Sequence, residues 1–67
     1  MLNCPLDARE MDIVRRLSNG QVAKTIAGDI GASLTSVNNS VITACRLVRA
    51  KNRTELVAIA LRKGWIE

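Results

Sequence analysis

The side chains best suited to molecular recognition lie in one stretch of the chain, residues 34–49. Asn38 and Asn39 each carry an amide that is both a donor and an acceptor of hydrogen bonds. One such amide can form two hydrogen bonds with an adenine, one to N6 and one to N7. Thr35 could reach a base or a phosphate, and Ile42 could contact a thymine methyl group. The alternative for each Asn is a solvated surface amide, so both interpretations stay open.

The positive charge of the chain lies in its second half. Residues 1–33 hold four basic and four acidic residues, whereas residues 34–67 hold six basic and two acidic ones and so carry the whole net charge of +4. Residues 46–53 contain four cations and no anion. Such a cluster is typical of a phosphate-binding surface, but cations at a helix C-terminus also interact favourably with the helix dipole. Composition alone does not distinguish a phosphate-binding surface from cations that interact with the helix dipole.

Five cations are candidates for contacts with DNA phosphates, which position a protein on a duplex without distinguishing its bases. They are Lys24, Arg46, Arg49, Lys51 and Arg53. Lys24 is favoured because it lies near a predicted turn, and Arg46 because it falls on the outer face of a predicted helix. Arg53 could equally cap or support the junction between two helices.

The residue inventory argues against catalysis and metal binding. The chain has no histidine and two cysteines, Cys4 and Cys45, without a CxxC motif. We therefore expect no enzyme activity, cofactor, metal site or disulfide framework, and Cys45 is most simply a small buried hydrophobic residue. No apolar run approaches the ~20 residues of a membrane span, and no secretory signal opens the chain. These features predict a cytoplasmic protein that does not bind membranes.

Residues 22–49 form a predicted helix-turn-helix that would position the recognition side chains. Apolar residues at i, i+3, i+4 and i+7 predict a helix over residues 22–30, and Gly31 can adopt the left-handed conformation that ends it. Ser33 is a predicted N-cap for a second helix over residues 34–49. The buried face of that helix is predicted to hold Val37, Val41, Ala44, Cys45 and Val48. Its predicted outer face holds Thr35, Asn38, Asn39, Ile42, Thr43 and Arg46. Two short helices joined by a turn, with a polar face on the second, are typical of DNA binding.

Two further helices complete a predicted all-α domain of four helices that spans residues 1–67. After a short lead-in, Asp7 and Glu10 form a predicted capping box for a helix over residues 7–18. Asn52 is a predicted N-cap for a last helix over residues 53–63. Because the chain has one aromatic residue, its core must be mainly aliphatic.

The last helix has an apolar surface too wide for one core contact. Leu56 and Ala60 mark its predicted buried centre, and further apolar residues lie on both flanks. This width predicts packing against the same helix of a second copy in a two-fold dimer, or a cover formed by the lead-in or Trp65. The predicted dimer interface holds Thr54, Val57, Ala58 and Leu61.

Three segments match a known pattern in register. Residues 6–10 (LDARE) resemble an L-T-x-R-E start. Gly20, Ile26-Ala27, Ser33 and Val37 fall at the spacing of a G…I-A…S-x-x-T-V run. Residues 52–57 (NRTELV), with Ala60 and residues 64–66 (GWI), resemble N-R-T-E-L-V…A…G-L-I. From residue 6 to residue 66 the chain therefore resembles the LuxR/GerE-type helix-turn-helix family, the C-terminal DNA-binding module of many bacterial response regulators and quorum-sensing regulators.

The resemblance implies a four-helix domain whose third helix enters the major groove of double-stranded DNA and whose fourth helix commonly mediates dimerisation. The chain departs from the family where Asn38 and Ser40 replace its usual Lys and His, and where Arg49 replaces its usual Gly. Residues 34–43 consequently carry no charge.

We expect a sequence-specific transcription regulator of bacterial, phage or plasmid origin that acts as a homodimer and lies on the nucleoid when bound. The family module is usually attached to a sensor or receiver domain, and these 67 residues hold none, so we expect abundance or a partner to set activity. The alternative is a small protein-interaction module that pairs with a larger LuxR-type regulator and modulates or blocks it. The uncharged residues 34–43 favour this alternative, and the cations of residues 46–53 oppose it.

Overall fold

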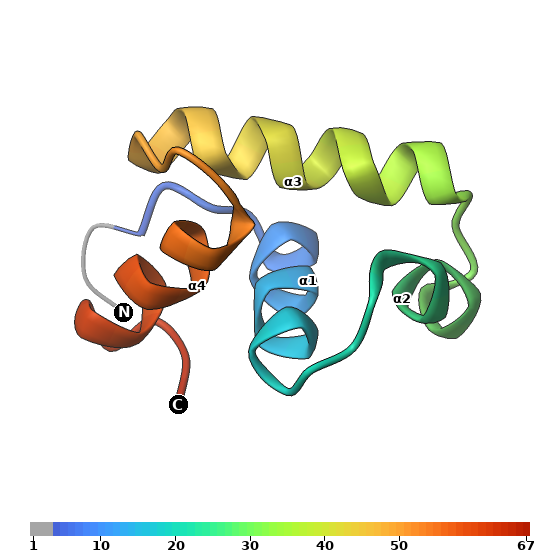
Figure 1. Cartoon of the computed structure of the whole chain (residues 1–67), viewed down its shortest axis with the longest axis horizontal. Coiled ribbons are helices and arrows are strands. Elements are labelled where there is room, and N and C mark those ends of the chain that lie inside the picture. Colours follow the sequence, from blue (N-terminus) through green and yellow to red (C-terminus); the bar gives the residue numbers. More distant parts are fainter. Residues whose placement is uncertain (1–3) are drawn as a thin grey trace.

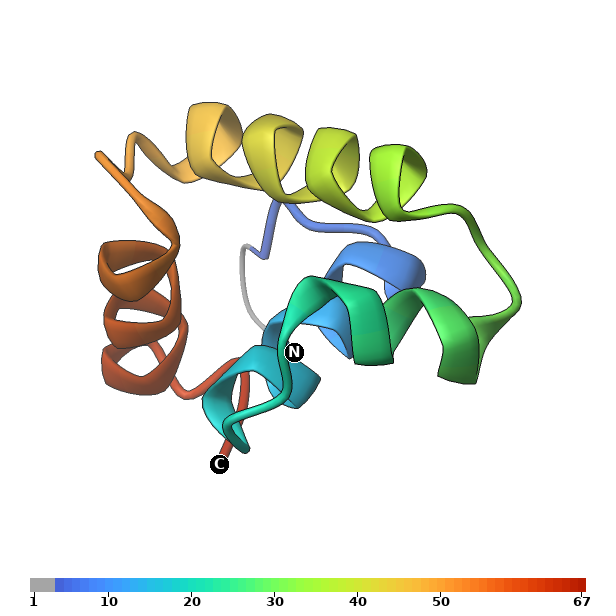
Figure 2. The same cartoon turned by 45° about the vertical axis from the view of Figure 1, so that its right-hand side comes forward.

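A computed structural model describes residues 4–67, and this part of the chain forms four helices: α1 (Ala8–Ser18), α2 (Ala23–Ile30), α3 (Leu34–Val48) and α4 (Arg53–Arg62). The long α3 lies across one side of the molecule, with the three shorter helices beneath it (Figure 1). Figure 2 shows α2 under one end of α3 and α4 under the other, with α1 between them. The predicted all-α fold of four helices is confirmed. The first half of the predicted lead-in, residues 1–3, lies outside the described residues.

Side-chain caps fix the starts of three helices. The carboxylate of Asp7 accepts from the N–H of Glu10 at 2.7 Å, and that of Glu10 accepts from the N–H of Asp7 at 3.0 Å, which confirms the capping box. The hydroxyl of Ser33 accepts from the N–H of Ser36 at 3.0 Å and caps α3. Val22 is the N-cap residue of α2, but it provides no side-chain cap, because the side chain of valine has no hydrogen-bond acceptor.

The cap of α4 differs from a reciprocal box. Asn52 accepts from the N–H of Glu55 at 2.8 Å, as predicted. The Glu55 carboxylate, however, accepts from the N–H of Lys51 at 2.6 Å, one residue before the cap. This second bond ties the α3–α4 connection to the first turn of α4.

An aliphatic core holds the four helices together, as composition predicted. Its largest fully buried side chains come from every helix: Ile13, Val14, Ile26, Val37 and Leu56. Trp65 and Ile66 are also buried, so the chain folds back onto the core after α4. Cys45 and Val48, which are predicted to lie on the buried face of α3, are only partly buried and pack at the edge of the core.

The two left-handed residues that end α2 and α3 are unlike each other. Gly31, with φ +70°, ends α2 as predicted. Arg49, with φ +62°, ends α3, and the N–H of Ala50 donates to the carbonyl of Cys45 at 2.8 Å in the bond typical of a Schellman motif. A residue with a Cβ in this conformation costs roughly 1–2 kcal/mol relative to glycine. The turn after α3 therefore has the geometry of a glycine C-cap, but arginine occupies the position that glycine usually takes.

Polar contacts join α1 to both helices of the helix-turn-helix. Arg16 of α1 donates to Asp12 at 3.2 Å and to Asp29 of α2 at 3.3 Å. Arg9 of α1 donates to the hydroxyl of Ser36 in α3 at 2.7 Å. Because these groups are partly exposed, with the Arg16 and Asp29 side chains 30% and 48% exposed, the contacts orient the helices while core packing supplies most of the stability. None of the helices in the described part of the chain is long and apolar enough to cross a membrane.

Candidate nucleic-acid interface

The outer face of α3 presents one continuous exposed stripe. Thr35, Asn39, Ile42 and Arg46 follow each other at i, i+4, i+7 and i+11, and all four are exposed. Thr43 is exposed beside them. The buried residues Val37, Val41 and Ala44 lie on the opposite side of the same helix. The core thus fixes which face of α3 points outward, and the stripe runs along it.

Asn38 lies at the edge of this stripe rather than within it. Its side chain is half-buried, whereas that of Asn39 is exposed. The reason is helical geometry, because Asn38 is only about 100° around the helix from the fully buried Val37. The structure therefore corrects the prediction that both amides belong equally to the outer face.

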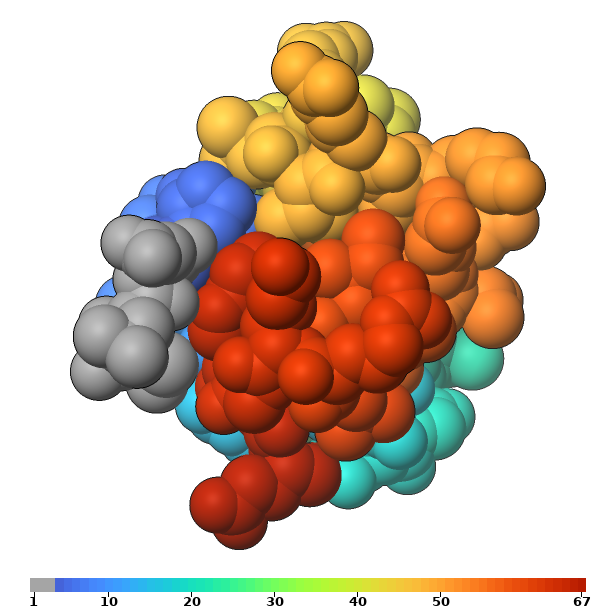
Figure 3. Space-filling model, turned by 90° about the vertical axis from the view of Figure 1, so that its left-hand side faces the viewer, coloured from blue at the N-terminus to red at the C-terminus, as the bar shows by residue number. Residues whose placement is uncertain are grey.

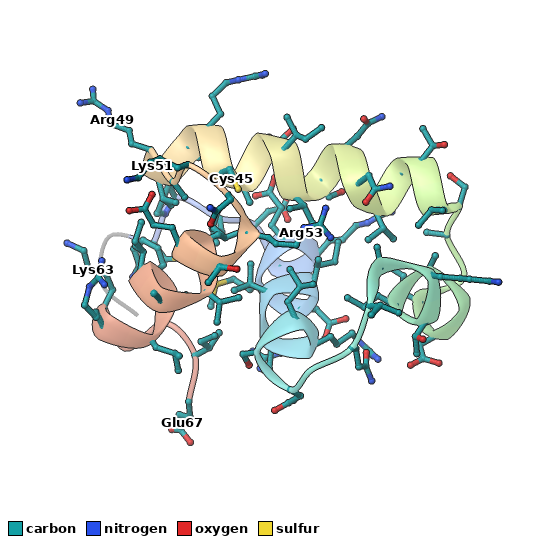
Figure 4. All side chains as sticks on the ribbon, viewed as in Figure 1. Cys45, Arg49, Lys51, Arg53, Lys63 and Glu67 are labelled. Carbon is teal, nitrogen blue, oxygen red and sulfur yellow. The ribbon has the colours of Figure 1, made fainter. Side chains whose placement is uncertain are left out.

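The predicted phosphate-contacting cations fall into two groups. Four of them, Arg46, Arg49, Lys51 and Arg53, are exposed and follow one another from the last turn of α3, through the connection, to the first residue of α4. Figure 4 shows Arg49 and Lys51 projecting outward at this end, and Lys63 further away at the end of α4. Lys24 is exposed in the first turn of α2, apart from that group. The cations do not form one cluster, but they flank the helix-turn-helix from both sides.

A groove of about 350 Å³ runs between α3 and the start of α4. Its lining residues are Val41, Ile42, Cys45, Lys51, Asn52 and Arg53. Ile42, on the outer stripe, therefore shares a groove with two of the candidate cations. Sequence periodicity did not reveal this groove, because its walls come from two helices and their connection, and no single-helix pattern encodes it.

Cys45 sits in the wall of that groove and is only partly buried. Burial raises the pKa of its thiol above the ordinary value, the nearby Arg53 guanidinium lowers this pKa, and Glu55 raises it. The net direction is upward, so the thiol is protonated and uncharged at neutral pH. Within residues 4–67 there is no group of three or more Cys, Asp or Glu side chains that could hold a metal ion.

The face of α4 that was predicted to dimerise is open to solvent in part. Leu61 is 47% exposed and Thr54 is exposed, whereas Val57 and Ala58 are half-buried. Figure 3 shows α4 and the segment after it at the centre of one end of the molecule. Trp65 is buried in the core, and Leu61 is nearly half exposed.

A second groove, of about 330 Å³, adjoins this face of α4. Its walls combine Thr54, Val57 and Arg53 of α4 with the end of α1 and the α1–α2 turn. The side-chain oxygen of Gln21, from that turn, is buried beside it without a hydrogen-bond partner. The α1–α2 turn was absent from the sequence-predicted interface, because nothing in its local pattern places it next to α4.

Comparisons with known proteins agree with this architecture. The model of bacterial regulatory proteins of the luxR family (GerE) matches residues 5–60. The uncharacterized transcriptional regulatory protein YvfU of Bacillus subtilis is 39% identical over 62 residues, which cover 92% of this chain and 31% of that protein. The response regulator RamR of Streptomyces coelicolor is 34% identical over 61 residues, 91% of this chain and 30% of that protein. No solved structure gives a significant match.

The family match over most of the chain shows that the chain belongs to the luxR family of bacterial regulatory proteins. The domains of this family are helix-turn-helix DNA-binding domains of transcription regulators. That class is one of DNA-binding domains and not of enzymes. The chain spans about a third of the length of the two relatives.

Proposed function

We propose that the chain is a sequence-specific transcription regulator that inserts α3 into the major groove of DNA. The observation that carries this proposal is the exposed stripe of Thr35, Asn39, Ile42 and Arg46, turned outward by the buried face of α3. A recognition helix contacts base edges through its N-terminal part. Thr35 and Asn39 lie in that part, with Asn38 at the edge of the stripe. Ile42 follows at the middle of the helix, and Arg46 lies in its last turn.

The cations then position the domain on the duplex. Arg46, Arg49, Lys51 and Arg53 would meet phosphates at the C-terminal end of α3, and Lys24 would meet them near the start of α2. The groove beside Ile42 supports this assignment for Lys51 and Arg53, because both line it next to the outer stripe. Phosphate contacts of this kind fix register and orientation, and leave base discrimination to α3.

The active species that we propose is a homodimer formed through Thr54, Val57, Ala58 and Leu61 of α4. Support comes from the partly exposed apolar face at one end of the molecule. A two-fold dimer would place two copies of α3 about one helical turn apart on a pseudo-palindromic site. Such a protein would act in the cytoplasm and lie on the nucleoid when bound.

A charge-matched pair of variants tests the DNA-binding surface. Arg46→Ala should weaken binding to every duplex sequence and reduce the salt slope by about one phosphate per protomer, because a phosphate contact carries no sequence information. Lys63→Ala removes the same charge from the far end of α4 and should leave the slope unchanged. Fluorescence-anisotropy titrations at several salt concentrations measure both. An Arg46→Ala variant with the wild-type slope, or one weakened on a single sequence only, would contradict this surface.

One observation favours a second function, that of a module that pairs with a larger LuxR-type regulator and modulates or blocks it. The first ten residues of α3, 34–43, offer no charge to DNA, while the α4 face is open for a partner. This function predicts that the chain forms heterodimers with a full-length LuxR-type regulator through α4. It also predicts that the regulator loses its DNA binding in these heterodimers. Co-purification combined with DNA titration of the mixture distinguishes it from the homodimeric regulator.

A further inference from the structure

The part of α3 that meets base edges has an unusual chemistry for a DNA-contacting surface. Its exposed side chains are hydroxyls, the amide of Asn39 and two apolar groups, Leu34 at the start of the helix, 47% exposed, and Ile42 at the centre of the outer stripe, 53% exposed. Residues 34–43 contain no Arg, Lys, Asp or Glu. The commonest specific contact to guanine uses Arg or Lys, and contacts to the cytosine amino group use carboxylates. Neither type of contact is available from these ten residues.

Arg46 does not fill this gap. It lies one turn beyond Ile42, in the last turn of α3, next to the other exposed cations. Base edges are contacted from the N-terminal part of a recognition helix. Arg46 is therefore placed for the phosphate backbone.

An exposed apolar side chain in the major groove discriminates between base pairs. Over a G·C pair, Ile42 would cover guanine acceptors or the cytosine amino donor without offering a hydrogen bond, which is unfavourable. Over an A·T pair it can instead pack against the C5-methyl group of thymine. Asn39, exposed one turn earlier on the same stripe, carries the amide that bonds adenine N6 and N7.

We infer that this domain recognises adjacent A·T pairs in each half-site, with the C5-methyl group of one thymine packed against Ile42 and an adenine bonded by Asn39. This inference rests on the proposed insertion of α3 into the major groove. It adds the type of DNA sequence that is recognised: the base pairs under the centre of α3 are A·T pairs, and the affinity for DNA depends on the C5-methyl group of a thymine.

The test uses uracil, which keeps the pairing and the O4 acceptor of thymine but lacks the C5-methyl group. Duplexes that bind the whole chain are selected from a random library, and the strongest is resynthesised with 2′-deoxyuridine at one thymine at a time. One position per half-site should lose affinity about three- to fivefold, which is the effect of a single buried methyl-sized group. A second duplex with 5-methylcytosine paired to guanine at that position should bind better than the same duplex with cytosine.

Variants show whether Ile42 is the side chain that contacts the methyl group. In Ile42→Ala the thymine and uracil duplexes should bind equally. Leu47→Ala is the matched control, because Leu47 is 48% exposed on the same helix and about 140° around it from Ile42. This control should keep the full difference between thymine and uracil.

Two results would overturn the inference and leave DNA binding intact: strong selected duplexes with G·C pairs under the centre of α3, or a uracil effect of the same size in Ile42→Ala. Absence of salt-dependent binding to any duplex would be a different failure. It would remove the proposed function itself, and this inference with it.

Discussion

Arg49 shows how a single residue can serve binding at a cost in stability. It holds the left-handed conformation at the end of α3, where a glycine would be unstrained, and its exposed guanidinium stands among the candidate phosphate contacts. Strained residues tend to persist where they have a function. We therefore propose that the side chain at this position has two separable effects, one on folding and one on DNA binding.

We predict that Arg49→Gly raises stability and lowers DNA affinity together. Removal of the Cβ should relieve about 1 kcal/mol of strain, since glycine adopts this conformation freely. Loss of the cation should reduce the salt slope by about one phosphate per protomer. Thermal unfolding and anisotropy titration measure the two effects separately. Arg49→Lys keeps both the Cβ and the charge, so it should show neither change; a less stable Arg49→Gly would refute the strain assignment.

Cys45 offers a chemical probe of the groove beside Ile42. We predict that bound DNA slows alkylation of Cys45 by iodoacetamide, because DNA on the outer stripe would cover the groove that this thiol lines. Cys4 is an internal control, since its sulfur contacts that of Met11 in α1, 3.4 Å away, and not this groove. Peptide mass spectrometry after timed alkylation compares the two sites. Equal rates at Cys45 with and without saturating DNA would place the duplex elsewhere.

At the scale of elements, the α2–turn–α3 unit contains two glycines, and only one of them has a backbone conformation that requires glycine. Gly28 has an ordinary helical backbone within α2, and a Cβ there would meet no atom within 4 Å. Gly31 has φ +70° at the end of the same helix, where a Cβ is strained whatever the space. The same substitution should therefore act in opposite directions at these two positions.

We predict that Gly28→Ala stabilises the domain by about 0.5–1 kcal/mol, because alanine loses less backbone entropy in a helix. Gly31→Ala should destabilise it by roughly 1–2 kcal/mol. For a domain of this size, 1 kcal/mol corresponds to a shift in Tm of about 4–8 °C. Calorimetry or thermal circular dichroism gives both values. A fall in Tm for Gly28→Ala would show that α2 needs its glycine for another reason.

Local signals predicted the elements well and their mutual contacts poorly. The caps at Asp7, Ser33 and Asn52 and the stop at Gly31 follow from short-range hydrogen bonding and backbone sterics, which adjacent residues determine. The outer stripe of α3 follows from helical period. The two grooves could not be derived in this way, because they depend on how neighbouring helices pack. The Glu55 bond to the N–H of Lys51 depends on the path of the α3–α4 connection.

At the scale of the whole molecule, two faces remain for partners: the outer stripe of α3 along one side, and α4 at one end (Figures 1 and 3). These faces are separate, so a dimer formed through α4 would leave both copies of α3 free. The outer stripe of α3 and the second copy therefore do not compete, although the candidate phosphate contact Arg53 adjoins Thr54 of the proposed dimer interface in one groove.

We predict that Leu61→Glu converts a dimer to a monomer without unfolding it. Leu61 is 47% exposed, so a charge there is tolerated in the isolated domain but would be buried without a partner in the interface. Sedimentation equilibrium measures the mass, and circular dichroism checks the fold. Leu47→Glu places the same charge on an equally exposed leucine of α3 and should keep the wild-type mass. A Leu61→Glu variant with the wild-type mass would exclude this interface.

The most direct test of the central claim is the salt dependence of DNA binding by the unmodified chain. Fluorescence anisotropy with a labelled mixed-sequence duplex should show affinity falling by roughly 10³ to 10⁵ between about 50 and about 200 mM salt, as expected for about six to ten phosphate contacts per dimer, which is about three to five per protomer. That result would establish a phosphate-contacting surface and identify conditions for site selection. Affinity that does not change with salt, or no binding even at the lowest salt, would contradict the account and point to a protein partner at α4.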